Sequence, residues 1–134
     1  MQQWDEMLNR VNQDNSFMRH NGIRAVSLST EQAVTEAEVD ERSLNPYRIA
    51  HGGLYFTMMD IAAGMAARAD GRRYVTLNCS TNFHKPAQAG TALRAVGRVT
   101  QRSRGVCVVE AEVRGIADQL LYASGSFCMY CIER

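Results

Sequence analysis

The feature that most constrains the fold is one apolar segment with helical character along its whole length. Over residues 52–67 the sequence GGLYFTMMDIAAGMAA is apolar or small except for Thr57, the Tyr55 hydroxyl and Asp60. A helix that is apolar almost all the way round must be buried. A carboxylate in its middle is costly unless it has a partner or takes part in chemistry. Asp60 is therefore the first candidate functional residue.

Two glycines open this segment directly after a histidine, in the order His51, Gly52, Gly53. The first N–H groups of a helix have no partner within the helix, and the helix dipole adds positive potential there. We therefore expect both glycine N–H groups to be bare and able to bind an oxyanion or a carbonyl oxygen. The alternative interpretation is an ordinary turn with a loose cap, in which Asp60 is a structural carboxylate.

Length and charge exclude several classes of protein. The chain has 134 residues, a mass of 15.0 kDa, a net charge of +1 and 22% charged residues, so we expect one domain and no bulk attraction to nucleic acid or to an anionic membrane. The apolar run is shorter than the roughly 20 residues of a membrane span, and the polar N-terminus lacks the apolar core of a signal peptide. These features predict a cytoplasmic protein.

The cysteines and histidines do not form a recognisable metal or redox motif. The four cysteines, at positions 79, 107, 128 and 131, lie in apolar strand-like runs, which predicts reduced and buried thiols. The histidines, at positions 20, 51 and 84, are widely spaced. We therefore expect no metal, and the chain also lacks the motifs of serine and cysteine nucleophiles.

The remaining patterns predict an α+β fold in a single domain over residues 1–134. Hydrophobic periodicity predicts an N-terminal amphipathic helix over residues 1–21, and period-two alternation predicts strands on both sides of the central helix. One long antiparallel sheet wrapped around the central helix would bury that helix with few other elements. The expected strands are Ile23–Ser29, Gln32–Asp40, Tyr74–Phe83, Thr91–Gln101, Val106–Arg114 and Leu120–Ile132, and the central helix is Gly52–Arg68.

This order of elements resembles the hot-dog fold thioesterases, and among them most closely the PaaI-like acyl-CoA thioesterases. The resemblance is carried by Asn45, the His51-Gly52-Gly53 turn and Asp60, with Thr76 in the strand that follows the helix. Nearly the whole chain is covered, from about Gly22 to Ile132. The compound motif is far more specific than the His-Gly-Gly turn alone.

The resemblance implies a role for each of five residues. The Gly52 N–H would polarise the thioester carbonyl, and the Asn45 amide would assist it. Asp60 would activate water or attack as a nucleophile, the Thr76 hydroxyl would help to hold the water, and His51 would lie near the leaving thiolate. Family members draw these groups from two chains, with Asn45 and the glycine turn on one and Asp60 and Thr76 on the other.

A coenzyme A substrate needs groups that bind phosphate, and its binding candidates lie in three places. Lys85 and His84 follow a strand, Arg102, Ser103 and Arg104 surround a predicted hairpin, and Gly53 belongs to the helix start. Each charged candidate can equally be an ordinary surface residue.

Arg48 departs from the family pattern, which often has glycine at this position. Arg48 is either a solvated loop charge or a contact to the ligand.

Together these features predict an acyl-CoA thioesterase that needs no cofactor beyond the coenzyme A of its substrate. We expect at least a homodimer and, from the family, a homotetramer. The acyl group stays open, with aromatic phenylacetyl-type groups as one possibility. Two alternatives are a non-catalytic acyl-CoA binding or sensing module and a hydratase or dehydratase of the same fold.

Overall fold

A computed structural model describes residues 2–133 of the chain. Met1 and Arg134, the ends of the predicted domain, lie outside the described residues. In chain order the elements are α1 (Gln2–Asp14), α2 (Ser16–His20), β1 (Ile23–Leu28), β2 (Gln32–Glu38), a short 3-10 helix (Glu41–Ser43), α3 (Gly52–Arg68), β3 (Tyr74–Phe83), β4 (Ala92–Arg102), β5 (Val106–Gly115) and β6 (Leu121–Cys131).

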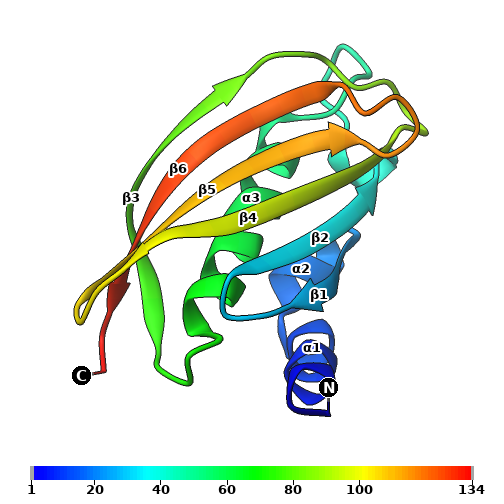
Figure 1. Cartoon of the computed structure of the whole chain (residues 1–134). Helices are drawn as coiled ribbons and strands as arrows, with labels where there is room; N and C mark the ends of the chain where they lie inside the picture. The colour runs from blue at the N-terminus through cyan, green and yellow to red at the C-terminus, as the bar shows by residue number, and fades with distance from the viewer. Residues whose placement is uncertain (1, 134) are drawn as a thin grey trace.

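The strands form one antiparallel sheet in the order β1-β2-β4-β5-β6-β3. Figure 1 shows this sheet curving around α3, while α1 and α2 lie beside the β1–β2 edge. The predicted α+β hot-dog fold is confirmed, and α3 has the bounds that the sequence predicts. The predicted strands are also present, with ends that differ by one or two residues.

Close contact between α3 and β4 explains the small residues of the helix. Ala62 and Ala63 are fully buried. A Cβ atom placed on Gly97 of β4 would lie 3.2 Å from the carbonyl carbon of Ala62 and 3.3 Å from the nitrogen of Ala63. Two of the three nearest atoms belong to the helix backbone, and the third is Cγ1 of Val109 at 3.2 Å, so a methyl group here would push helix and strand apart.

The sheet leaves one stripe of α3 uncovered. Asp60, Gly64 and Arg68 follow one another at intervals of four residues and therefore lie on the same face of the helix. Asp60 and Arg68 are partly exposed, whereas Gly64 lies beneath the Arg68 guanidinium and is buried. Asp60 is thus less buried than the apolar segment predicts, because its side chain projects from this stripe.

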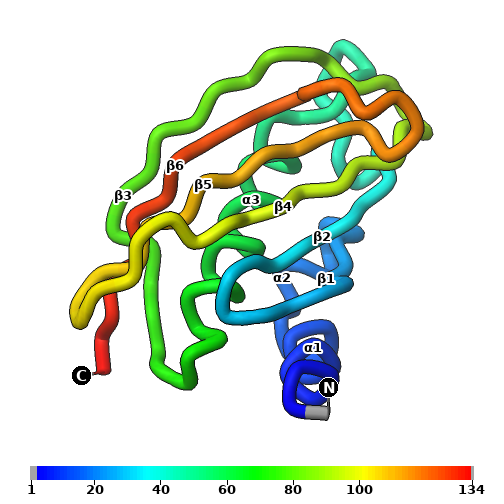
Figure 2. The backbone as a smooth tube through the Cα atoms, viewed as in Figure 1, coloured from blue at the N-terminus to red at the C-terminus, as the bar shows by residue number. Residues whose placement is uncertain are grey.

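Strand β3 forms the edge of the sheet opposite β1 (Figure 2) and is exposed along most of its length. Two of its large apolar side chains, Val75 and Leu77, are 49% and 59% exposed. Cys79, in the middle of the strand, is also exposed, and Cys128 of β6 is half-buried, so the prediction of four buried thiols is wrong at these two positions. All four cysteines are free thiols.

The N-terminal segment differs from the predicted single helix. It divides at Asn15, whose side-chain oxygen accepts a hydrogen bond from the Met18 N–H at 3.0 Å and so caps α2. Asparagine favours such caps over helix interiors because its side chain bonds the nearby backbone. Within residues 2–133, no helix is long and apolar enough to cross a membrane.

The contact at Gly97 yields a stability prediction. Replacing Gly97 with Ala should lower the free energy of unfolding by about 1–3 kcal/mol, because the added methyl group meets backbone that cannot move aside without shifting α3. Urea unfolding measures this change. Arg98→Gln, on the outer face of the same strand, is the matched control and should change stability by no more than about 0.5 kcal/mol. Equal stability of Gly97→Ala and wild type would show that the contact is not tight.

Candidate functional site

His51 caps the start of α3 and changes which N–H groups are free. Its Nδ1 accepts a hydrogen bond from the Gly53 N–H at 2.8 Å, and its carbonyl accepts one from the Leu54 N–H at 2.9 Å. The prediction of two bare glycine N–H groups is therefore wrong for Gly53. The Gly52 N–H has no acceptor among residues 2–133, so the helix start offers one directed donor.

The loop before α3 is organised by Asn45. Its side-chain oxygen accepts hydrogen bonds from the backbone N–H groups of Tyr47 at 2.9 Å and Ile49 at 3.3 Å. The side-chain oxygen is thus used to shape the loop. In the described part of the chain the Nδ2 group has no acceptor, and it is the group that could assist a carbonyl.

Arg48 lies in this loop with a φ angle of 66°, in the left-handed region that favours glycine. This conformation gives a physical reason for the glycine that the family often has at the position. The Arg48 guanidinium pairs with the Glu41 carboxylate at 2.6 Å on the surface. Arg48 is therefore a loop charge with an internal partner.

A surface hollow of about 240 Å³ lies beside Gly52 and includes Phe83, His84 and Lys85 in its wall. His84 Nε2 lies 2.9 Å from the Ser124 hydroxyl, and the Lys85 ammonium lies over the Tyr122 ring. Of the predicted coenzyme A ligands, His84 and Lys85 are the two that the fold brings to the free Gly52 N–H.

Tyr55 fixes the floor of this hollow. Its hydroxyl donates to the Lys85 carbonyl at 2.8 Å, and its ring stacks on Phe83. Burial raises the pKa of Tyr55 to about 12, so the hydroxyl stays protonated and keeps this hydrogen bond at neutral pH. The strand end that carries His84 and Lys85 is thereby tied to the first turn of α3.

Asp60 and Thr76 meet on the open stripe of α3. The Thr76 hydroxyl donates to Asp60 Oδ1 at 2.6 Å, across from β3 to the helix. A hydrogen bond this short to a carboxylate is charge-assisted and holds the carboxylate in one orientation. The other carboxylate oxygen, Oδ2, has no hydrogen-bond donor among residues 2–133.

Gly52 and Asp60 are too far apart to act on the same carbonyl group within one chain. They are separated by eight residues of helix, which corresponds to about 12 Å along the axis. A polarising donor and an activated water must each lie about 3 Å from the reacting group. In one chain the structure therefore holds two half-sites.

The hairpin candidates lie at the opposite end of α3, and Arg102 has an internal role. Its guanidinium donates to the carbonyls of Ala66 and Ala67 at 2.9 Å each, to the Thr30 carbonyl at 3.0 Å and to Asp70 at 2.8 Å. Both Nη groups of Arg102 are thus engaged at the end of the helix. Such a contact joins residues more than thirty positions apart and has no local sequence signal. The binding of Arg102 to coenzyme A stays a prediction.

Ser103 and Arg104 form the hairpin itself. The Ser103 hydroxyl donates to the Val106 carbonyl at 3.0 Å, and the Arg104 carbonyl accepts from Arg72 at 2.6 Å. The Arg104 side chain is exposed. Since α3 is about 25 Å long, these residues lie far from the Gly52 hollow of the same chain.

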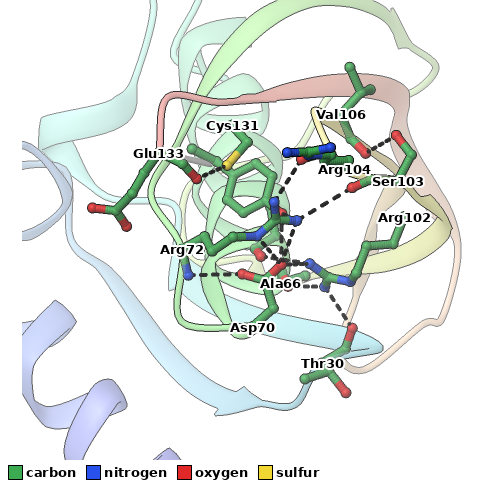
Figure 3. A network of polar contacts seen from close by, with 12 residues as sticks. Thr30, Ala66, Asp70, Arg72, Arg102, Ser103, Arg104, Val106, Cys131 and Glu133 are labelled. Atoms are coloured by element: carbon green, nitrogen blue, oxygen red, sulfur yellow. Dashed lines mark hydrogen bonds and ion pairs between the residues drawn. The ribbon is translucent and has the colours of Figure 1, made fainter.

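Asp70 anchors a polar network that the sequence analysis did not find (Figure 3). Its carboxylate accepts hydrogen bonds from the Tyr74 hydroxyl at 2.7 Å, from Arg72 and from Arg102. Burial opposes ionisation of Asp70, but the hydrogen bonds from Tyr74 and Arg72 and the charge of Arg102 outweigh it and lower its pKa. The network locks the end of α3 to the start of β3 and to the β4–β5 hairpin.

Comparison with known proteins identifies the family. The sequence model of the thioesterase superfamily matches residues 47–121, which include the helix start, Asp60 and Thr76. The chain belongs to the thioesterase superfamily. Conserved protein PA5202 from Pseudomonas aeruginosa shares 31% identity with a TM-score of 0.81, over 87% of this chain and 94% of that one.

Two further solved structures are similar to this chain. Protein smu.793 from Streptococcus mutans UA159, solved with acetyl CoA bound, shares 30% identity with a TM-score of 0.79, over 84% of this chain and 90% of that one. The PaaI protein of E. coli, from the phenylacetic acid degradation operon, has a TM-score of 0.91 at 23% identity, over 98% of this chain and 94% of that one. At that identity the likeness to PaaI demonstrates the shared thioesterase fold.

A curated relative from Archaeoglobus fulgidus, whose name suggests an esterase, is 24% identical over 98 residues. The match covers 73% of this chain and 64% of the archaeal protein. The chain thus spans less than two thirds of the length of this relative.

The role of Arg102 in this thioesterase superfamily chain can be tested by its removal. Arg102→Met should lower the free energy of unfolding by about 3 kcal/mol, since it removes one of the donors to the Asp70 carboxylate and the side-chain donor to two helix-end carbonyls. Arg104→Met is the matched control, because it removes an exposed charge two residues away, and it should change stability by less than about 0.5 kcal/mol. Denaturant unfolding of both variants decides the point. Similar stability of the two would contradict an internal role for Arg102.

Proposed function

We propose that this protein hydrolyses an acyl-CoA thioester to the free acid and coenzyme A. The observation that carries the proposal is the Thr76–Asp60 hydrogen bond of 2.6 Å on the one stripe of α3 that the sheet leaves open. It orients a carboxylate toward solvent in the middle of an otherwise apolar helix. Membership of the thioesterase superfamily and the acetyl CoA bound to the Streptococcus mutans relative support the same reaction and substrate class.

In the proposed reaction water adds to the thioester carbonyl, and the carbon–sulfur bond breaks. Asp60 accepts a proton from the attacking water, or alternatively attacks the carbonyl itself to give an anhydride that water then hydrolyses. The Gly52 N–H, assisted by the Asn45 amide, stabilises the negative charge on the carbonyl oxygen. The products are a carboxylic acid and the coenzyme A thiol.

His51 is suited to the leaving group. Because its Nδ1 accepts from the Gly53 N–H, the neutral ring carries its proton on Nε2. That N–H can donate to the departing thiolate. A thiolate is a good leaving group, so a hydrogen bond to its sulfur is enough to assist its departure. A more basic leaving group would need a full proton transfer.

The 12 Å separation within one chain favours a site shared between two chains. Gly52, Asn45 and His51 would come from one protomer, and Asp60 and Thr76 from its partner. The exposed edge of β3 is the natural place for that partner, because a ten-residue edge without proline or lysine is open to pairing with another strand. Two β3 strands paired in this way would join two sheets in a homodimer, and the tetramer predicted from the sequence would contain two such dimers.

Lys85 and His84 are proposed as contacts to coenzyme A, since both line the hollow beside Gly52. A lyase of the same fold receives less support: His51 is engaged at the start of α3, nine residues before Asp60, and is not paired with that carboxylate. A binding or sensing module without catalysis would bind acyl-CoA and release no thiol.

Removal of the Gly52 N–H tests the polarising role directly. Proline fits the first position of a helix, and the His51 backbone, at φ −66° and ψ 139°, is compatible with a following proline. Gly52→Pro should therefore fold and lower kcat about 10²–10³-fold in a thiol-release assay. Gly52→Ala keeps the N–H, and its methyl group meets the Phe83 ring at an ordinary 3.6 Å, so it should retain most activity. Equal activity of the two variants would exclude the N–H from the reaction.

Mixing two inactive variants tests whether the site is shared. Asp60→Asn should lower activity about 10²–10⁴-fold. When it is unfolded and refolded together with Gly52→Pro in equal amounts, half of the dimers should be mixed and hold one intact site each. Activity should then recover to about a quarter of the wild-type value. Each variant refolded alone is the control, and a mixture as inactive as its components would place the complete site within one chain.

A further inference from the structure

A cavity lies between the N-terminal helices and the end of α3. It has a volume of about 760 Å³, and its wall includes Met7 and Val11 from α1, Phe17 from α2, and Arg68 from α3. Met7 and Val11 are half-buried, and Phe17 is 64% exposed at the cavity. The wall thus combines apolar side chains with charged ones, which also include Arg10, Asp14 and Arg72.

Arg68 differs from the two other arginines at this end of α3. Arg72 and Arg102 donate to the Asp70 network and to backbone carbonyls. The Arg68 guanidinium, although only partly exposed, makes no hydrogen bond or ion pair with any group among residues 2–133. Burial lowers the pKa of its guanidinium, an effect that the charge of Asp60 opposes. A desolvated cation without a partner gains more than a solvated one from binding an anion.

The position of the guanidinium connects the cavity to Asp60. The Arg68 side chain runs back along α3, so that a Cβ atom on Gly64 would lie 2.8 Å from Arg68 Nη1. Gly64 is one turn from Asp60, which places the cation about 6 Å from the region of the reacting carbonyl. That distance matches the length of an acyl chain of about five carbons with a group at its far end.

We infer that Arg68 binds the terminal carboxylate of an ω-carboxyacyl group whose methylene chain lies along the open stripe of α3 between Asp60 and Gly64. A carboxylate matches the planar guanidinium with two parallel hydrogen bonds. The inference rests on the proposed thioesterase function and specifies its substrate class. Arg68 would thus be a specificity residue rather than a catalytic one.

The test compares two thioesters that differ only at the chain end, pentanoyl-CoA and glutaryl-CoA. Wild-type protein should hydrolyse glutaryl-CoA with a kcat/KM at least about 10-fold higher. Arg68→Gln should lose that preference by a fall in kcat/KM for glutaryl-CoA, while the value for pentanoyl-CoA changes less than about threefold. Arg98→Gln removes the same charge from the outer face of the sheet and should keep the wild-type preference.

A second variant separates binding from folding. Gly64→Ala keeps the charge of Arg68 but places a methyl group where Nη1 now lies, so the guanidinium must move. Alanine also favours the helix over glycine, so this variant should be at least as stable as wild type. It should nevertheless lose part of the preference for glutaryl-CoA. Thermal unfolding, followed for all variants, records the stability.

The outcomes distinguish the two proposals. A wild-type preference for pentanoyl-CoA, or a preference for glutaryl-CoA that survives in Arg68→Gln, would overturn the role of Arg68 and leave the thioesterase function intact. If neither thioester is hydrolysed, equilibrium binding of the same two compounds decides. Tighter binding of glutaryl-CoA that is lost in Arg68→Gln would support the carboxylate site and refute hydrolysis, whereas equal binding of both would refute the two proposals together.

Discussion

The structure depends on the burial of one apolar helix by one sheet. Alanine and glycine side chains allow the strands to approach α3 so closely that backbone meets backbone at Gly97. A single sheet curved around a cylinder cannot enclose it fully, and the strip that it leaves open is where polar side chains can be tolerated. Asp60 and Arg68 both project from that strip. The packing that drives folding therefore also determines where polar side chains can lie on α3.

The backbone groups at the two ends of α3 differ in their hydrogen-bond partners. At its start the dipole and the Gly52 N–H, which has no acceptor among residues 2–133, provide positive potential. At its end Arg102 satisfies the last carbonyls, and Asp70 holds Arg102 in place. A cation at the end of a helix is favourable for the dipole, so this network stabilises the helix without drawing on the groups at its start. One end is therefore available to a ligand, and the other serves stability.

Local signals in the sequence predict the fold well, whereas long-range contacts are missed. The apolar run and the glycine pair predict the bounds of α3, and period-two alternation predicts every strand to within one or two residues. The pairing of Asp60 with Thr76 agrees with the placement expected from the family. The capture of the Gly53 N–H by His51 and the use of Arg102 depend on side-chain directions that spacing alone does not encode. The sequence also does not indicate that the Arg68 guanidinium makes no hydrogen bond or ion pair within residues 2–133.

Strand β3 carries Thr76, whose hydroxyl holds the Asp60 carboxylate in place. Most of this strand is exposed, and it pairs with another strand on one side only. A strand with so little cover frays at a lower free energy than the rest of the sheet. A second chain that covered β3 would order the carboxylate by mass action, so catalytic competence would rise and fall with protein concentration. Dilution alone could then switch the protein off while its helices remain folded.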